Sequence, residues 1–500
     1  MKGFWVLSVF AFAVLGAAAV WMGGLNQDEG WYLYAANLVA EGKVPYRDFF
    51  YTQGPLLPIV YSAFVPIWSA WGLLGARIFT LALGVCGILF AVALTRRLAP
   101  EERRAEAGLA VFLLLGCNLY HLYYVAIPKT YALASLFVLI GFYLLSVAYE
   151  KRNALAILAG LSFALAAGSR ISLGAILCVV GLGLLLSRRW KTLAGFCLGG
   201  FAGLVLVYGP FLWNEGARAG LVAAQRYHAA RGGFDPTWTI GSLSRLVRWY
   251  LPVFIVLGLG VGKCLVPRAV VQRSTQHQAL STNILLWSFL AVFAVQMLAP
   301  FPYEDYQVPV MGLLAVYAVV NFVSGGMSSE HPSIGASEQV RRVLLVLGLC
   351  FASSFGSPLL EKWMTNGQDR FWSLKKEKCE LAQLRDVAKR IETLDPGGKE
   401  LFTQDLYLAI EAGRRVPKGL EMGPFSILTD QEWRNLIARL NCPIAALSGY
   451  TFAIEPPVCA ERSVELQMEY WSALKRRYEL VDREDAFGQN ATPLLILKRK

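Results

Sequence analysis

Residues 4–29 read FWVLSVFAFAVLGAAAVWMGGLNQDE, and this stretch decides how the rest of the chain is interpreted. Its apolar part, 4–24, has the length of about 20 residues that a helix needs to cross a bilayer. Lys2 precedes it and residues 16–19 (GAAA) resemble a cleavage site, so a signal peptide is the alternative. We expect an uncleaved membrane anchor, because the run is longer than a typical signal-peptide core and further apolar segments follow.

The composition indicates an integral membrane protein. Of the 500 residues, 56% are hydrophobic and only 16% are charged, and the mean hydropathy is +0.46. A soluble core cannot bury that much apolar surface, so a disordered chain, a fibrous repeat and an ordinary cytosolic enzyme are excluded. The net charge is +12. Because the basic residues do not gather with aromatic residues in a compact patch, nucleic acid is not expected as a partner.

Apolar segments recur along the first 360 residues, and about eleven of them have the character of membrane spans. They cover 4–24, 75–95, 106–125, 130–149, 154–169, 171–187, 192–213, 250–266, 283–300, 308–324 and 343–360. The segments 154–169 and 171–187 are short and can instead form a re-entrant hairpin. The sequence thus predicts a polytopic helical protein.

Clusters of Lys and Arg predict the orientation of these spans. With eleven alternating spans, all clusters fall on the side of Lys2; they lie at 96–104, 151–152, 188–191, 263–273 and 341–342. This side is expected to be cytoplasmic, with the N-terminus. The loop 25–74, the loop 214–249 and the tail, 361–500, then lie on the external face of the plasma (inner) membrane.

The tail is long enough for one small domain and has a mixed pattern. Helical stretches are predicted at 374–393, 430–440 and 465–477, and short strand-like runs at 400–403, 444–447 and 494–497. We therefore expect a transmembrane domain, 1–360, followed by a small α/β extracytoplasmic domain, 361–500. In an oxidising compartment Cys442 and Cys459 can pair, and free thiols are the equally open alternative.

The external loop 25–74 carries the most informative polar residues. Asp28 and Glu29 follow the first span directly, and the aromatic segment 30–38 predicts a helix on the membrane surface. The apolar stretch 55–72, interrupted by two prolines, predicts a second interfacial helix. An acidic pair at this place can act as a general base, can hold a divalent cation, or can simply cap the helix.

The layout resembles the GT-C superfamily of glycosyltransferases that use polyprenyl-phosphate sugars, above all the protein O-mannosyltransferases and the lipid A aminoarabinose transferases. These families share an acidic pair after the first span, an aromatic interfacial helix, a Gly-x-x-Pro-Tyr segment, a Pro-Leu, an Ala-Arg at the second span, and a late Tyr three residues before a Pro. The matching residues here are Asp28-Glu29, Trp31 to Leu38, Gly42 to Tyr46, Pro55-Leu56, Ala76-Arg77, and Tyr306 with Pro309. Tail segments 403–405, 413–414 and 422–425 also resemble tails of this group.

The resemblance implies an inverting sugar transfer from a polyprenyl-phosphate donor to a lipid A, glycan or protein acceptor. It assigns Asp28 as the catalytic base and Glu29 as the second candidate, with a divalent cation on this pair left open. Two departures set the chain apart from the aminoarabinose transferases. Gln53-Gly54 stand where those enzymes have a Lys before Pro-Leu, and Glu304-Asp305 stand where an Arg or His precedes the late Tyr.

A departing phosphate needs cations to offset its charge. The candidates are the external basic residues Lys129, Arg170, Arg226 and Arg231, and Tyr306 is a candidate hydrogen-bond donor. The alternative for each cation is a snorkelling anchor at a span end, and for Tyr306 an ordinary interfacial aromatic.

Two other functions compete with the transferase. A transporter or lipid flippase predicts ionisable residues or helix breaks near the middle of the membrane, and few are present. A GT-C scaffold without activity is the third interpretation. The identity of the sugar and of the acceptor stays open.

Overall fold

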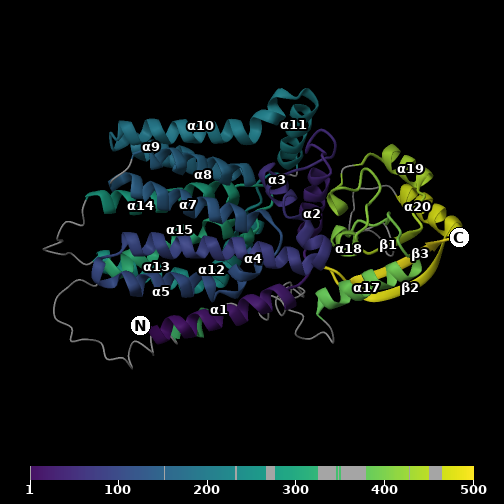
Figure 1. Ribbon diagram of the computed structural model, residues 1–500, viewed down its shortest axis with the longest axis horizontal. Coiled ribbons are helices and arrows are strands. Elements are labelled where there is room, and N and C mark those ends of the chain that lie inside the picture. Colours follow the sequence, from purple (N-terminus) through teal and green to yellow (C-terminus); the bar gives the residue numbers. More distant parts are fainter. Residues whose placement is uncertain are drawn as a thin grey trace.

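The computed structural model shows a helix bundle with a compact tail domain at one end (Figure 1). The structure describes all residues except 1, 151–152, 231–232, 266–275, 325–344, 347, 351–378, 427 and 450–463. Most of the predicted last span, 343–360, lies outside the described residues. The N-terminus lies at the end of the bundle opposite the tail domain (Figure 1).

The bundle contains long and short helices. In chain order these are α1 (Lys2–Met22), α2 (Gln27–Ala40), α3 (Leu56–Ser62), α4 (Val65–Leu98), η1 (Glu101–Arg103), α5 (Arg104–Gly116), α6 (Leu119–Ala126), α7 (Thr130–Glu150), α8 (Leu155–Ser169), η2 (Ile171–Leu173), α9 (Gly174–Leu186), α10 (Trp190–Trp213), α11 (Glu215–Ala230), α12 (Pro236–Trp249), α13 (Leu251–Leu265), α14 (Gln276–Met297), η3 (Glu304–Gln307) and α15 (Val308–Ser324).

Among the described residues, five helices are each long and apolar enough to cross a bilayer: α1, α4, α7, α10 and the segment Glu304–Ser324. Two bent pairs, α5 with α6 and α12 with α13, raise the number to seven if each pair is one span. Large apolar side chains point outward, such as Val6, Phe201 and Leu206, which are 71%, 69% and 66% exposed. Such a surface is stable only against lipid, so the chain is a multi-pass membrane protein.

The predicted number of about eleven spans is not confirmed. The predicted span 106–125 is two helices that meet at an angle of 68°, because the chain breaks at Cys117 and Asn118 caps a new helix. The segments predicted at 154–169 and 171–187 form α8 and α9, which are apolar but each too short to cross a bilayer alone.

The loop 25–74 contains the predicted first interfacial helix, α2. The predicted second interfacial helix is not one continuous helix. The apolar stretch 55–72 is divided: α3 ends at Ser62, and Pro66 stands in the first turn of α4. At Gly72 the backbone adopts φ 63° and ψ −155°, so the first turns of α4 are kinked away from the rest.

The tail domain is an α/β unit, as predicted. It contains α17 (Glu380–Leu394), α18 (Leu406–Glu411), η4 (Gly423–Phe425), α19 (Asp430–Arg439), β1 (Ile444–Leu447), α20 (Val464–Arg477), β2 (Tyr478–Phe487) and β3 (Thr492–Arg499). The strands form an antiparallel sheet in the order β1-β3-β2, with Ile444 opposite Lys498 and Tyr478 opposite Arg499.

Two details of the tail differ from the prediction. Strand β2 was not predicted, because most of its side chains are exposed and apolar residues do not alternate along it. The run 400–403 forms isolated bridges through Glu400 and Phe402 rather than a strand. Cys459 lies outside the described residues, and its predicted pairing with Cys442 therefore stays a prediction.

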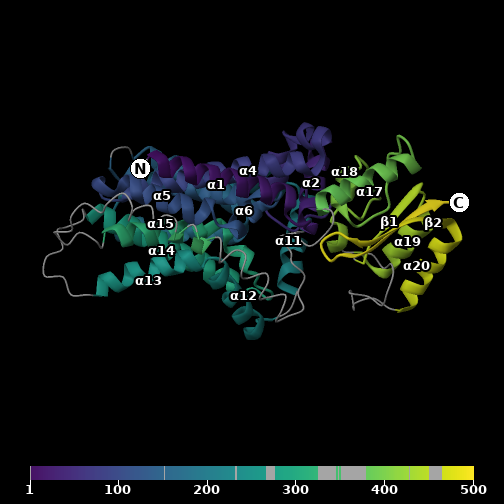
Figure 2. The ribbon, with the colours of Figure 1, turned by 90° about the horizontal axis from the view of Figure 1, so that it is seen from below.

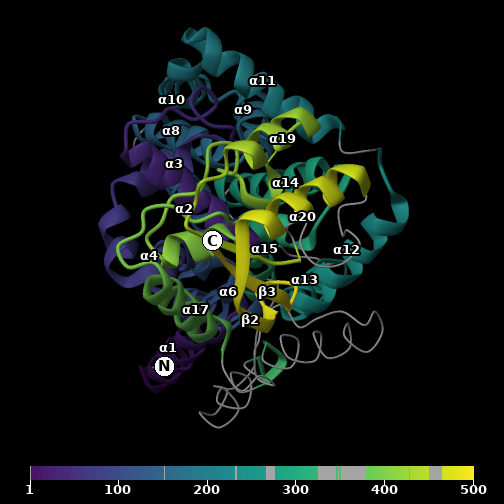
Figure 3. The same cartoon turned by 90° about the vertical axis from the view of Figure 1, so that its right-hand side faces the viewer.

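The tail packs directly on α2 and on the start of α4, and α2 lies between it and the bundle (Figure 2). Seen from the tail side, the tail domain covers this end of the bundle (Figure 3). Apolar side chains of the loop 25–74 and of the tail form one buried core, in which Tyr32 and Leu57 join Leu406 and Leu497. At Gly30 a Cβ would collide with the backbone of α18, so this contact requires glycine. The tail is thereby fixed over the start of α2.

Candidate active site

A cavity of about 270 Å³ lies where α2, the start of α7, η3 and the tail domain meet. It brings together acidic, basic and aromatic side chains from segments that are far apart in the sequence. Its lining consists of Asn26, Gln27, Asp28, Trp31, Tyr32, Thr52, Gln53, Tyr124, Lys129, Tyr131, Arg170, Tyr227, Tyr303, Glu304, Asp305, Tyr306, Met422 and Gln489.

Asp28 lies in the first turn of α2 and faces this cavity. Asn26 caps the helix by accepting the backbone N–H of Asp28 at 3.0 Å, so the carboxylate of Asp28 is not the capping group. Its Oδ1 accepts the indole N–H of Trp31 at 3.0 Å, and its Oδ2 lies 2.8 Å from Nζ of Lys129. Burial raises the pKa of Asp28, but Lys129, with smaller contributions from Trp31 and Arg170, holds it below its ordinary value of 3.8.

Lys129 precedes α7 and bridges two carboxylates. Its Nζ lies 2.8 Å from Oδ2 of Asp28 and 2.8 Å from Oδ2 of Asp305. The hydroxyl of Tyr131 donates to the same Asp305 oxygen at 2.9 Å, and the ammonium lies 4.7 Å from the centre of the Tyr131 ring. Lys129 is 6% exposed. A snorkelling anchor would reach into water, whereas this lysine is held at the floor of the cavity.

Arg170 follows α8 and lies between two tyrosine rings. Its guanidinium carbon is 4.9 Å from the centre of the Tyr131 ring and 4.8 Å from that of Tyr306. Nη1 donates to the hydroxyl of Thr130 at 3.3 Å, while the buried Nε has no hydrogen-bond partner. In the described part of the chain Arg170 forms no ion pair. A buried guanidinium without a carboxylate is suited to bind an anion.

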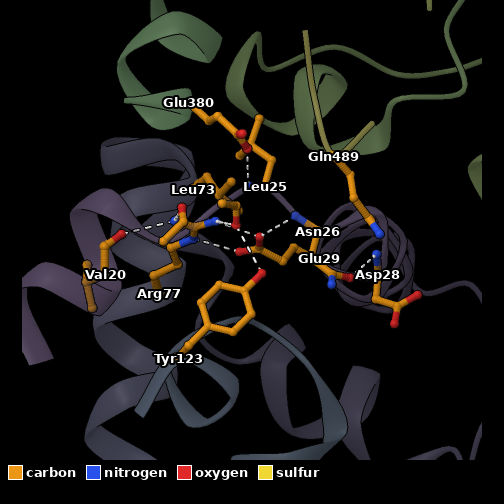
Figure 4. Close-up of polar contacts among 12 residues, drawn as sticks. Val20, Leu25, Asn26, Asp28, Glu29, Leu73, Arg77, Tyr123, Glu380 and Gln489 are labelled. Atoms are coloured by element: carbon orange, nitrogen blue, oxygen red, sulfur yellow. Dashed lines mark hydrogen bonds and ion pairs between the residues drawn. The ribbon is translucent and has the colours of Figure 1, made fainter. Parts of the chain in front are cut away.

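Glu29 points away from the cavity, opposite to Asp28 (Figure 4). Its two carboxylate oxygens each accept a hydrogen bond from Arg77 at 2.7 Å, and both side chains are fully buried. The remaining N–H groups of Arg77 bind the carbonyl oxygens of Val20, Gly23 and Gly24 at the end of α1. Glu29 and Arg77 therefore join α1, α2 and α4.

The other two predicted cations, Arg226 and Arg231, are not among the described residues that line the cavity. Arg226 is an exposed side chain of α11 and does not line the cavity, although its neighbour Tyr227 does. Arg231 lies outside the described residues. The structure thus brings together Asp28, Lys129, Arg170 and Tyr306.

Several residues of the site were not predicted. Asp305 was noted only as a departure in front of Tyr306, although two adjacent carboxylates at the entry of a span were themselves a signal. Glu304 accepts a hydrogen bond from Arg245 at 3.0 Å beside it. Gln489 at the turn between β2 and β3 accepts the backbone N–H of Gln27 at 2.8 Å. No local pattern predicts that contact across 462 residues.

Asp28 and Glu29 do not converge as the predicted metal site requires. Asp28 and Glu29 point apart, and among the described residues no group of three or more His, Cys, Asp or Glu side chains could hold a metal ion. The position between Asp28 and Asp305 is filled by the ammonium of Lys129.

The arrangement of the bundle, the surface helices and the tail is shared with solved protein structures. One of these structures is ArnT from Cupriavidus metallidurans bound to undecaprenyl phosphate, with a TM-score of 0.61 at 15% sequence identity. The match covers 99% of this chain and 98% of the ArnT chain. ArnT from the same organism in the apo state gives a TM-score of 0.59 at 14% identity. The predicted resemblance is confirmed at the level of the fold. No family model and no curated protein matches the sequence.

Proposed function

We propose that this protein is an integral-membrane inverting glycosyltransferase that moves a sugar from a polyprenyl-phosphate donor to an acceptor at the external face of the membrane. One observation carries the proposal: a single cavity at the end of the bundle combines the carboxylate of Asp28 with the cations of Lys129 and Arg170. A displacement at the sugar C1 requires a base on the acceptor side and positive charge on the phosphate side.

In this proposal Arg170 and Lys129 hold the phosphate of the donor. The guanidinium of Arg170 has a buried Nε without a hydrogen-bond partner and forms no ion pair with a carboxylate in the described chain, so a phosphate oxygen would supply its missing partner. Tyr306, which packs on this guanidinium, fixes its plane and lies at the same wall. The phosphate is a good leaving group once its charge is offset, so no general acid is required.

Asp28 is the proposed base. It accepts the proton of the acceptor hydroxyl or amine, the acceptor atom forms a bond to C1 with inversion, and the bond from C1 to the phosphate oxygen breaks to release polyprenyl phosphate. When the phosphate attracts Lys129, the ion pair with Asp28 weakens and the carboxylate becomes the stronger base. The donor would therefore activate the base that uses it.

A second cavity supports the choice of a lipid-linked donor. It measures about 230 Å³ and shares Thr52, Gln53, Arg170 and Tyr306 with the first. Its far wall is largely apolar and includes Val295, Ala299, Pro300 and Phe301 near the end of α14. A donor phosphate at Arg170 could thus extend its isoprenoid chain towards the lipid.

ArnT, whose fold the chain shares, is described as bound to undecaprenyl phosphate, and this agrees with such a donor. We infer the orientation that the sequence predicts: the protein lies in the plasma (inner) membrane, its N-terminus is cytoplasmic, and its tail domain is on the external face. The acceptor is a lipid such as lipid A, a glycan or a protein. A transporter or flippase predicts charges in mid-membrane, whereas the charged cavity described here lies at one end of the bundle.

The test is release of free polyprenyl phosphate by the purified protein in detergent. Wild type, Asp28→Asn and the control Asp48→Asn are incubated with a panel of polyprenyl-phosphate sugars, with and without a membrane extract as acceptor source. Asp48 lies in the same loop but pairs with Arg47 away from the cavity. Release by wild type and control that is lost in Asp28→Asn supports the proposal. Absence of release with every donor contradicts it.

A further inference from the structure

The ammonium of Lys129 occupies a position that in many phosphate-handling sites belongs to a metal ion. Two carboxylate oxygens, one from Asp28 and one from Asp305, converge on its Nζ at 2.8 Å each. They come from two elements that are far apart in the sequence, α2 and η3. Convergent carboxylates beside a phosphate site are a usual environment for a divalent cation. Here a side chain supplies the positive charge.

We propose that Lys129 replaces a divalent metal ion in this site, so that the protein handles the donor phosphate with its own cations only. The inference rests on the proposed function for the identity of the phosphate, but not for the geometry of the two carboxylates. The charges of the inner cavity balance without a metal: Asp28 and Asp305 face Lys129 and Arg170, and Glu304 pairs separately with Arg245.

The residues present do not fit a bound divalent ion while Lys129 is in place. An ion between the two carboxylates would compete with the ammonium for the same oxygens. The two cations would also lie close together, and their repulsion is strong in a buried site. Glu29, the other acidic residue next to Asp28, is fully engaged by Arg77.

A lysine gives this site a property that a metal ion would not. Two of the three ammonium protons point to Asp28 and Asp305, which leaves one for a ligand oxygen among the described contacts. The side chain can therefore shift from Asp28 towards a phosphate while Asp305, which accepts the hydroxyl of Tyr131, keeps hold of it. This flexibility allows the ammonium group of Lys129 to move from the base, Asp28, to the phosphate leaving group, as proposed above.

The test uses Mn²⁺ as the probe on the full-length protein in detergent. Free Mn²⁺ is followed by electron paramagnetic resonance, and Tm is measured with and without Mn²⁺. We expect wild type to show no stoichiometric Mn²⁺ site. In Lys129→Met the two carboxylates lose their cation, so Tm falls, one Mn²⁺ binds per chain, and saturating Mn²⁺ raises Tm by about 3–5 °C. The two carboxylates need to move little to bind the ion. Each oxygen lies 2.8 Å from the position of Nζ and must approach by roughly 0.7 Å to form a metal–oxygen bond of about 2.1 Å.

Two further variants make the result specific. Lys129→Met combined with Asp305→Asn should bind no Mn²⁺, because one of the two charged ligands is gone. Arg245→Met is the matched control, since it removes a cation that faces a single carboxylate, Glu304. If Lys129→Met does not fold, Lys129→Gln serves in its place, because its amide can still donate to Asp305.

The inference is overturned if wild type binds one Mn²⁺ that is lost in Asp28→Asn, or if neither Lys129 variant gains a site. Donor turnover in EDTA is the second readout, and wild type should keep its full rate. Loss of turnover in EDTA overturns the inference, whereas absence of turnover with every donor contradicts the proposed function and leaves the Mn²⁺ result decisive on its own.

Discussion

Asp28 and Glu29 are neighbours in the sequence, yet they belong to two different regions of the molecule. Glu29 enters the dry core, where Arg77 binds both of its oxygens and no solvent reaches either side chain. Asp28 faces the cavity, is 24% exposed at its side chain, and shares Lys129 with Asp305. The first ion pair has no freedom to change partners, whereas the second lies where a ligand can take one of its members. The difference teaches that burial and partner number, not residue type, separate a structural carboxylate from a reactive one.

The largest effect is expected from breaking the core pair. Arg77→Met leaves Glu29 charged and unpaired in the core and frees the carbonyl oxygens at the end of α1. We expect a loss of about 3–5 kcal/mol in the free energy of unfolding and little folded protein. Size-exclusion profiles and Tm in detergent measure this.

The matched variant for that experiment is Arg414→Met in the tail. Arg414 is also buried, but its partners Asp395 and Glu392 are 22% and 56% exposed and can be solvated when the arginine is removed. Its Tm should therefore fall less than that of Arg77→Met. An equal or larger fall would contradict the idea that the Glu29–Arg77 pair is the stronger structural contact.

On the cavity side, Arg170→Ala should raise the KM for the polyprenyl-phosphate donor by about 10- to 100-fold, because a charge-assisted contact to phosphate is lost. Steady-state kinetics with varied donor measure the change. Arg189→Ala is the control: Arg189 also stacks on a tyrosine, Tyr149, at 4.7 Å, but it does not line the cavity. A similar KM for both variants would remove Arg170 from donor binding.

The pH dependence should distinguish the paired from the unpaired state of Asp28. In the wild type the pKa of this carboxyl lies below 3.8 because of Lys129, so the base stays ionised until the pH falls below the ordinary range of Asp. In Lys129→Met burial still raises the pKa, but its main opponent is gone. The acid limb of the rate should therefore move to higher pH in the variant, whatever its absolute rate. An unchanged limb would mean that Lys129 does not control Asp28.

The smallest effect is expected for Arg226→Ala. The side chain is exposed on α11 and does not line the cavity, so kcat/KM for donor should change by less than about twofold, as is usual for surface substitutions. Initial rates at low donor concentration measure this. A large loss would show that α11 moves towards the cavity when the donor binds.

Much of this site could be predicted from residues that follow one another along the chain. The resemblance to the GT-C families singled out Asp28, whose place directly after a span puts it at the membrane surface. Lys129 and Arg170 were candidates because external cations oppose the usual charge distribution. The resemblance also paired Glu29 with Asp28. Successive residues of a helix point about 100° apart, and the sequence does not show which of the two side chains enters the core.

What could not be predicted depends on long-range contacts. Asp305 acquires its role only when η3 packs against the start of α7, and Gln489 only when the tail hairpin reaches α2. The kink inside α4 at Gly72 was also missed, because the apolar stretch 55–72 has no change of composition before it. The class of fold came from hydropathy and spacing, and the details came from tertiary packing.

The comparison of Asp28→Asn with Glu29→Gln tests the central claim most directly. Both variants remove one negative charge from adjacent positions, and both are measured for Tm and for donor-phosphate release at equal amounts of folded protein. We predict that Asp28→Asn keeps a Tm close to that of the wild type and loses turnover by at least about 100-fold. Glu29→Gln should lower Tm markedly while the folded fraction keeps turning over. Turnover that survives in Asp28→Asn but disappears in folded Glu29→Gln would contradict the account.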